Sequence, residues 1–246
     1  MVIGGLDLTQ VQILALLSTG RMQLVGQFSA GSNYAFLAVM DDGSIQVKAV
    51  YKPTRGENPL WDFPVRSLAR RETAAYLLSR WLGWDLVPPT VLRRDALLGT
   101  GSLQIFIEHD PNRHYFSLAR NELDRLKPAA LFDLVVNNAD RKGSHLVFDA
   151  NDRLWLIDHG VCFNAEDKLR TVIWDFAGDR IPSHLLSDLQ RACLVLSRDA
   201  ELFSLLHPYL TLPELKALAN RIEQLLAHPF YPHPPSDRRS YPYPPL

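Results

Sequence analysis

The chain has few cysteines, no long apolar run and no excess of charge of either sign. Its two cysteines among 246 residues, Cys162 and Cys193, make neither a disulfide framework nor a paired zinc motif, and they favour a reducing, cytoplasmic setting. A formal net charge of -1 provides no general basic surface, so we expect no nucleic-acid partner. The apolar runs are too short to span a bilayer and the first residues lack a signal-peptide pattern, so we expect no membrane insertion.

The apolar pattern that is present divides the chain into a β-rich half and a helical half. Hydrophobic residues make up 47% of the chain, enough for one large domain or two lobes around a cleft. Periodicity predicts strands over 34–40, 45–52 and 101–108, and helices over 8–17, 66–82, 129–136, 183–196, 200–207 and 212–227. The fold class expected is therefore α+β, with a β-rich N-lobe and a helical C-lobe.

This pattern predicts three regions along the chain. The β-rich N-lobe spans residues 1–107, and the helical C-lobe spans residues 108–229. A tail over residues 230–246 is rich in proline and cannot be regular helix or central strand. It is either an extended strap packed by its tyrosines or a disordered end.

Carboxylates at two turns are the strongest chemical signal. Asp140-Arg141 follows a predicted helix, and Asp158 closes an apolar strand. In phosphoryl transfer one such carboxylate orients a hydroxyl and the other holds a metal on the nucleotide phosphates, while a neighbouring Arg141 neutralises charge. Alternatively, Asp140 only stabilises its loop, as Asp often does.

Lys52 and Glu72 form a second candidate pair. Lys52 ends an apolar strand, where its ammonium group suits nucleotide phosphates. Glu72 lies on the next predicted helix among apolar positions, and a carboxylate that partly faces a core needs a partner. The pair predicts that Glu72 positions Lys52. A solvent-facing Lys and a solvated Glu remain the alternative.

Small residues and one histidine complete the candidates. Ser29, Gly31 and Ser32 lie between two predicted strands, where they either cover phosphates with backbone N–H groups or form a simple hairpin turn. His145 follows Asp140 closely. Its imidazole is either a metal ligand or a structural group bonded to the loop backbone.

The order of these pieces resembles a known family. Ser29-Ala30-Gly31-Ser32, Val50-Tyr51-Lys52-Pro53, Glu72-Thr73-Ala74-Ala75-Tyr76, Asn138-Ala139-Asp140-Arg141 and Ile157-Asp158-His159-Gly160 resemble the motifs of the type II phosphatidylinositol 4-kinases. The chain is most similar to bacterial proteins described as phosphatidylinositol 3-/4-kinase-like. Their fold is protein-kinase-like and two-lobed. In the eukaryotic enzymes a metal-binding Asn occupies the place of His145.

The resemblance implies an ATP-dependent kinase that moves the γ-phosphate to a hydroxyl of a lipid, a protein or a small molecule. It implies ATP and Mg²⁺ or Mn²⁺ as cofactors, with Asp158 and His145 on the metal. The nucleotide would contact Lys52 and the strand end at Gln104, Phe106 and Ile107. The alternative is a pseudokinase, a nucleotide-binding or protein-docking module without turnover.

Overall fold

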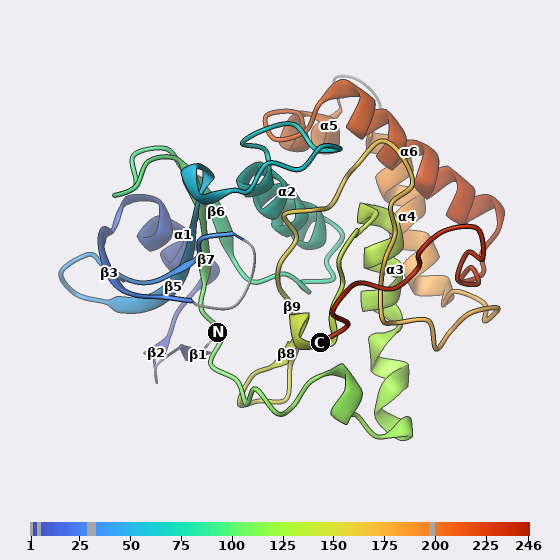
Figure 1. The fold of residues 1–246 in the computed structure, drawn as a ribbon, viewed down its shortest axis with the longest axis horizontal. Helices are drawn as coiled ribbons and strands as arrows, with labels where there is room; N and C mark the ends of the chain where they lie inside the picture. The colour runs from blue at the N-terminus through green and yellow to red at the C-terminus, as the bar shows by residue number, and fades with distance from the viewer. Residues whose placement is uncertain (1, 4–5, 29–32, 197–199) are drawn as a thin grey trace.

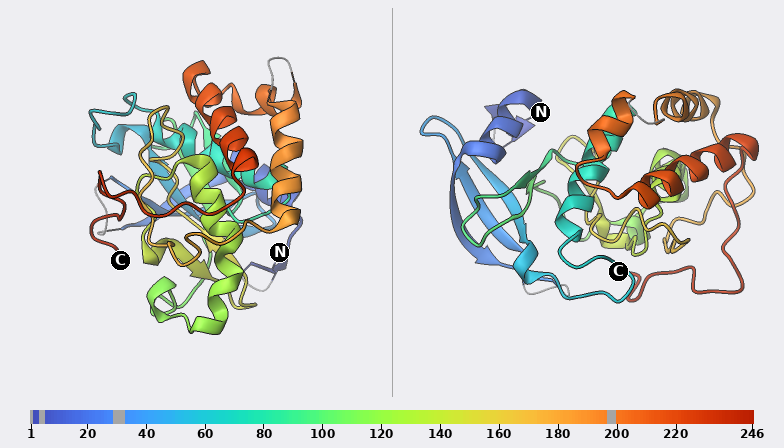
Figure 2. Two further views of the ribbon diagram at one scale, coloured as in Figure 1. Left: turned by 90° about the vertical axis from the view of Figure 1, so that its right-hand side faces the viewer. Right: turned by 90° about the horizontal axis from the view of Figure 1, so that it is seen from above.

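The protein folds into two lobes, as Figure 1 shows. A computed structural model describes residues 2–3, 6–28, 33–196 and 200–246. Seen from above (Figure 2, right), the blue strands of the first lobe lie at one side and the orange helices of the second at the other. The α+β class expected from the sequence is confirmed. The boundary between the N-lobe and the C-lobe at residues 107/108 stays a prediction.

An antiparallel sheet forms the first lobe. Within the described residues its order is β3-β4-β5-β7-β6. The strands are β3 (Arg21–Gln27), β4 (Phe36–Asp41), β5 (Gln46–Pro53), β6 (Thr90–Arg93) and β7 (Gly101–Ile105). Successive side chains of a strand point to opposite faces. On β5, Val47, Ala49 and Tyr51 are buried in the core, so Lys52 points the other way.

Two helices, α1 and α2, pack against the sheet. Helix α1 (Gln10–Thr19) packs on β4, β6 and β7, and Thr9 and Gln12 form a capping box at its start. A short hairpin, β1 (Val2–Ile3) with β2 (Leu6–Asp7), precedes it. Helix α2 (Leu68–Trp81) connects β5 to β6 and contacts β6, β7 and α5.

The second lobe is mainly helical. Pro128 lies in the first turn of its first α-helix, as the sequence predicted, and Asn137, with φ 53°, ends that helix. Its helices are α3 (Lys127–Val136), α4 (Ser183–Val195), α5 (Glu201–Leu206) and α6 (Leu212–Ala227). Strands β8 (Leu146–Phe148) and β9 (Leu154–Leu156) form a hairpin. Short 3₁₀ turns are η1 (Thr54–Gly56), η2 (Tyr115–Ser117), η3 (Arg120–Leu126) and η4 (Gly143–His145).

The hydrophobic cores cross the lobe boundary. Ala75 and Leu78 of α2 belong to the core of the helical lobe. Val147 and Trp155 of the β8–β9 hairpin belong to the core of the sheet lobe. Because each lobe contributes apolar side chains to the other's core, the cleft between them has fixed walls.

The C-terminal segment is an extended strap, which we define as residues 229–246. It runs from α6 across the helical lobe, in dark red in Figure 1, and both views of Figure 2 place its end at the edge of the molecule. Thr171 N donates to Ser240 O (3.1 Å), and Gly143 N donates to Pro245 O (2.8 Å). Of the alternatives open from the sequence, the structure shows an extended strap, but of its tyrosines Tyr231 is buried, whereas Tyr241 and Tyr243 are exposed. Among the described residues, no helix has the length and apolar character to cross a bilayer.

Candidate functional site

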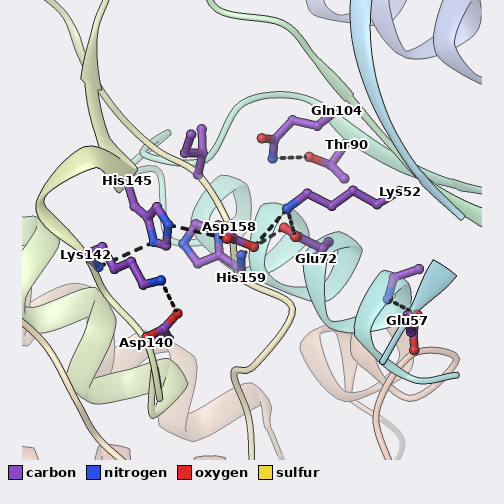
Figure 3. A network of polar contacts seen from close by, with 12 residues as sticks. Lys52, Glu57, Glu72, Thr90, Gln104, Asp140, Lys142, His145, Asp158 and His159 are labelled. Atoms are coloured by element: carbon purple, nitrogen blue, oxygen red, sulfur yellow. Dashed lines mark hydrogen bonds and ion pairs between the residues drawn. The ribbon is translucent and has the colours of Figure 1, made fainter. Parts of the chain in front are cut away.

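A cleft of about 400 Å³ lies where the sheet, α2 and the loops around Asp140 and Asp158 meet. Charged side chains from both lobes line it, and Figure 3 shows most of them. They are Lys52, Glu57, Asp62, Glu72, Asp140, Lys142, Asp158 and Arg170. Of the residues expected at the site, Lys52, Glu72, Asp140 and Asp158 are thus brought to one cavity.

Lys52 is held between two carboxylates. Its Nζ donates to Glu72 Oε1 (2.5 Å) and to Asp158 Oδ1 (2.9 Å), as Figure 3 shows. Glu72 also accepts from the backbone N–H of His159 (2.9 Å). The Glu72 side chain is 4% exposed, whereas that of Asp158 is 49% exposed. Glu72 therefore belongs to the frame of the site, and Asp158 faces the open cleft.

The charges of this trio stabilise each other. Burial alone would lower the pKa of Lys52, but attraction by Asp158 and Glu72 outweighs it and raises that pKa above its usual range. The ammonium group of Lys52 in turn holds the pKa of Asp158 well below its usual range. Both groups are therefore ionised at neutral pH. Asp158 has φ 61°, a left-handed conformation that Asp adopts more readily than most residues.

His145 points at the same carboxylate. Its Nε2 lies 3.4 Å from Asp158 Oδ2, and Lys142 N–H lies 3.4 Å from its Nδ1. Burial lowers the pKa of His145 to about 4, so the imidazole is neutral at pH 7, the form that binds metals. A carboxylate with an imidazole suits Mn²⁺ better than Mg²⁺, which prefers oxygen. The described residues hold no cluster of three or more His, Cys, Asp or Glu placed for a metal, so phosphate oxygens and water would complete the shell.

Asp140 faces the cleft from the loop after α3. Its Oδ2 lies 3.4 Å from Lys142 Nζ, and its backbone N–H donates to Asn138 Oδ1 (2.9 Å). Burial raises the pKa of Asp140 to about 6. A carboxylate with this pKa suits proton transfer near neutral pH, because an efficient catalytic base titrates close to the operating pH.

The side chains at the strand end expected to contact the nucleotide have different environments. Gln104 is buried and donates through Nε2 to Thr90 Oγ1 (2.9 Å), and Ile107 belongs to the sheet-lobe core. The ring of Phe106 stacks near that of Phe28, with 6.5 Å between centroids. Phe106 thus keeps an accessible position, whereas Gln104 and Ile107 are occupied internally. Ser29, Gly31 and Ser32 lie outside the described residues.

Comparison with known proteins places the chain in a family and a fold. No family model matches it. Protein Rv2133c of Mycobacterium tuberculosis is 34% identical over 265 residues, which cover 94% of each chain. The chain belongs to the family of Rv2133c.

Solved structures show that this family has a kinase-like fold. The crystal structure of the Golgi casein kinase with Mn/ADP bound matches 89% of this chain and 75% of its own, with a TM-score of 0.60 and 18% identity. The structure of hydra Fam20 with sugar matches 92% and 90%, with a TM-score of 0.56 and 17% identity. The Helicobacter pylori proinflammatory kinase CtkA matches 87% and 94%, with a TM-score of 0.54 and 11% identity. The kinase-like part of the expected resemblance is therefore confirmed.

Arg141 does not lie in the cleft, where the sequence interpretation had placed it. Its side chain is 0% exposed, and Nε donates to both carboxylate oxygens of Asp133 (3.0 and 3.1 Å). It also donates to Ile157 O (2.8 Å) and to the neutral imidazole of His159 (2.8 Å). A guanidinium needs a carboxylate when it is buried, and the helix supplies one. Arg141 therefore holds the Asp140 loop and the segment around Asp158 in place from the buried side of the cleft.

Asp133 on α3 is a site residue that the sequence analysis missed. Besides Arg141, it accepts from Asn138 Nδ2 (3.0 Å) and from Thr171 Oγ1 (3.2 Å), and it is fully buried. These bonds join α3 to the Asp140 loop and to the segment that follows Asp158. A carboxylate inside the apolar run Leu131-Phe132-Asp133-Leu134-Val135-Val136 was the available signal, since a buried charge requires partners.

Arg71 is the second missed residue, next to Glu72 on α2. Its guanidinium is buried, pairs with Glu214 of α6 and donates to Cys162 O (2.5 Å). The ring of Phe63 lies 4.8 Å from the guanidinium carbon. Arg71 thereby connects α2, the helix that carries Glu72, to the helical lobe. This connection fixes the position of Glu72 at the cleft.

Proposed function

We propose that this protein is an ATP-dependent phosphotransferase that moves the γ-phosphate to a hydroxyl acceptor. The observation that carries the proposal is the position of Lys52 between Glu72 and Asp158, with Asp140 in the same cleft. Phosphoryl transfer needs charge stabilisation and positioning rather than covalent chemistry from the protein. A fixed ammonium group, an exposed carboxylate and a carboxylate of raised pKa supply those elements.

Each residue has a distinct role in the proposal. Lys52, held by Glu72, binds the nucleotide phosphates. Asp158 and His145 hold the divalent metal, which neutralises phosphate charge when bound. Asp140 orients the acceptor hydroxyl and takes its proton. Ser29, Gly31 and Ser32 cover the phosphates, and the nucleotide base lies beside Phe106.

The relatives support the nucleotide and the metal. The Golgi casein kinase structure contains Mn and ADP, and the donors at Asp158 and His145 suit Mn²⁺. We propose that this chain, too, binds a nucleotide and a divalent metal. Affiliation with the phosphatidylinositol 3-/4-kinase-like proteins, and a lipid, protein or small molecule as acceptor, belong to the same proposal.

A nucleotide-binding module without turnover is the second candidate. His145 stands where the eukaryotic phosphatidylinositol kinases have a metal-binding Asn, and Lys52 already engages Asp158 at 2.9 Å. In such a module ATP would raise the melting temperature without metal. No phosphate would be transferred to any acceptor.

Nucleotide binding and turnover separate the two candidates. We expect ATP with Mn²⁺ to bind the wild type and to be converted to ADP, and we expect Lys52→Met to weaken the binding. Titration calorimetry and ADP release measure the two steps. ATP binding that is the same with and without metal, together with no ADP formation under any condition, would reject the phosphotransferase.

A further inference from the structure

A second cavity, of about 560 Å³, lies on the other side of the Asp140 loop. We call it the strap pocket, because Tyr241, Pro242 and Pro245 of the strap form one wall. The opposite wall includes Tyr115, Trp174 and Asp175. Its volume is typical of a small-molecule site, which occupies about 300–1,000 Å³.

The strap pocket adjoins the Asp140 loop directly. Gly143 N donates to Pro245 O (2.8 Å), and Val172, which also lines the pocket, donates through its backbone N–H to Arg141 O (3.2 Å). The end of the strap thus lies against η4, the turn that precedes β8, and both views of Figure 2 place it at the edge of the molecule. A molecule in this pocket would therefore lie next to the loop that carries Asp140.

The walls of the pocket are fixed by hydrogen bonds. Trp174 Nε1 donates to Ser240 O (3.2 Å), and Thr171 N donates to the same oxygen (3.1 Å). These bonds hold the strap against the segment that carries Trp174 and Asp175. The strap therefore forms a preformed wall, which reduces the ordering needed for a ligand to bind.

The chemistry of the strap pocket suits a cation. Asp175 is its charged lining residue, and one carboxylate oxygen accepts from Tyr115 Oη (2.6 Å). In the part of the chain that the structure describes, no Lys or Arg pairs with Asp175, and Oδ1 has no donor. Tyr115, Trp174 and Tyr241 add aromatic rings, whose faces attract ammonium groups. Prolines in the strap lack an N–H that could bind an anion.

The cleft at Lys52 differs from the strap pocket because cations line it as well. Lys52, Lys142 and Arg170 lie there among carboxylates and suit phosphates, whereas the strap pocket offers a carboxylate and aromatic rings. The loop from Asp140 to Gly143 borders both places, since Asp140 and Lys142 line the cleft and Gly143 contacts Pro245 of the pocket wall, so an acceptor held at Asp175 would lie along this loop.

We propose that the strap pocket binds the phosphoryl acceptor, and that this acceptor is a small hydroxyl compound carrying an ammonium group. Its role as acceptor site rests on the proposed function. The hydroxyl oxygen forms a bond to the γ-phosphorus, the bond from that phosphorus to the β–γ bridging oxygen breaks, and ADP leaves. The hydroxyl proton passes to Asp140.

Choline and its neutral analogue 3,3-dimethylbutan-1-ol test the proposal on the full chain. The two have the same shape and differ in the charge. By titration calorimetry without nucleotide we expect choline to bind about fivefold more tightly, since aromatic rings at a partly exposed site favour a cation by about that factor. Asp175→Asn should weaken choline binding by about three- to fivefold, as expected for an exposed ion pair.

Asp188→Asn is the matched control, because Asp188 also accepts from an aromatic donor, Trp84 Nε1 (2.9 Å), but lies outside the pocket. Its affinity for choline should equal that of the wild type. Equal binding of the neutral analogue, unchanged binding in Asp175→Asn, or binding only of lysine-containing peptides would overturn the inference.

The two proposals fail separately. ATP binding that depends on Lys52, without any binding of choline, would remove this inference and leave the proposed function. Choline binding that depends on Asp175, without any binding of ATP, would remove the proposed function and with it the acceptor role of the pocket. Formation of phosphocholine from ATP and choline would support both.

Discussion

Asp133 and Asp140 belong to one short stretch of chain, yet they have opposite environments. Asp133 is fully buried and accepts from Arg141, Asn138 and Thr171. Asp140 lies at the cleft, with Lys142 at 3.4 Å and a pKa raised to about 6. The first carboxylate is saturated with partners and holds the loop in place. The second is left with weak partners and is available to a substrate.

This contrast separates positioning from chemistry. Changes at Asp133 should act on stability and, through it, on the geometry of the cleft. Changes at Asp140, and at the similarly exposed Asp158, should act on turnover with little effect on stability. The predictions below test that separation, beginning with the largest effect.

Loss of the cleft carboxylates should have the largest effect. We expect Asp140→Asn and Asp158→Asn to reduce ADP formation by about 10²–10⁴-fold, because each removes a group that acts in the transition state. Rates of ADP release with Mn²⁺ and ATP measure this. Asp124→Asn, which removes a carboxylate that is 84% exposed on the surface, is the control and should retain full activity.

Full activity in both cleft variants would contradict the phosphotransferase. Melting temperatures of the two variants should stay close to that of the wild type, since both side chains are partly exposed. A loss of stability as large as that expected for Asp133 would erase the distinction between the two environments.

Breaking the buried pair should affect stability next most strongly. Arg141→Met leaves the buried Asp133 without its opposite charge, which should lower the free energy of unfolding by about 3–5 kcal/mol. Replacing both residues, as Asp133→Leu with Arg141→Met, should restore much of this loss, because an apolar pair of similar volume is often as stable as a buried ion pair. Urea denaturation measures the free energy of unfolding of the wild type, of Arg141→Met and of the double variant.

The double variant separates stability from activity most clearly. It lacks the bonds from Arg141 to Ile157 O and from Asp133 to Thr171, so the Asp140 loop should lose its anchoring even where the fold is stable. We expect turnover well below that of the wild type. Wild-type turnover in a stable double variant would show that the pair does not position the cleft.

The comparison also predicts a pH dependence. Asp140 must be ionised to accept a proton, and burial raises its pKa to about 6. Turnover should therefore fall as pH decreases through about 6 and level off above it. A profile of kcat/KM against pH, which reports ionisations of the free enzyme, measures this limb. A profile that is flat between pH 5 and 8, within about 20%, would show that Asp140 is not the base.

The smallest expected effect concerns Thr171. Thr171→Val removes the hydroxyl that donates to Asp133 Oδ2 (3.2 Å), and a hydrogen bond to a charged group contributes about 1.5–3 kcal/mol. The unfolding free energy should fall by the lower part of that range, since Arg141 remains. Thr19→Val, which removes an exposed hydroxyl bonded to Ala15 O, is the control. Equal losses of unfolding free energy in both variants would mean that the hydrogen bond to Asp133 stabilises the fold no more than an exposed one does.

Much of the fold could be predicted from the sequence, because local patterns decide it. The helix expected over 129–136 forms as α3 (Lys127–Val136), and the strand expected over 45–52 forms as β5 (Gln46–Pro53). The helix expected over 8–17 forms as α1 (Gln10–Thr19), which Thr9 and Gly20 flank as caps. Turns η2 and η3 were not predicted, since single 3₁₀ turns have little periodicity.

The candidate site was predicted unevenly. Lys52, Glu72, Asp140 and Asp158 share a cleft, because each lies on or follows an element whose apolar face fixed its direction. Arg141 was placed wrongly, since nothing local distinguishes an arginine that faces a cleft from one that pairs inward. Its partner Asp133 depends on how α3 packs behind the loop, which only the tertiary structure reveals.

The central claim is that the cleft at Lys52 and Asp158 binds nucleotide phosphates and a metal. A crystal structure of the protein with Mn²⁺ and a non-hydrolysable ATP analogue tests it most directly. We expect the phosphates to contact Lys52 Nζ, and the metal to contact Asp158 and His145. A nucleotide bound elsewhere, or a metal that contacts neither Asp158 nor His145, would contradict the account.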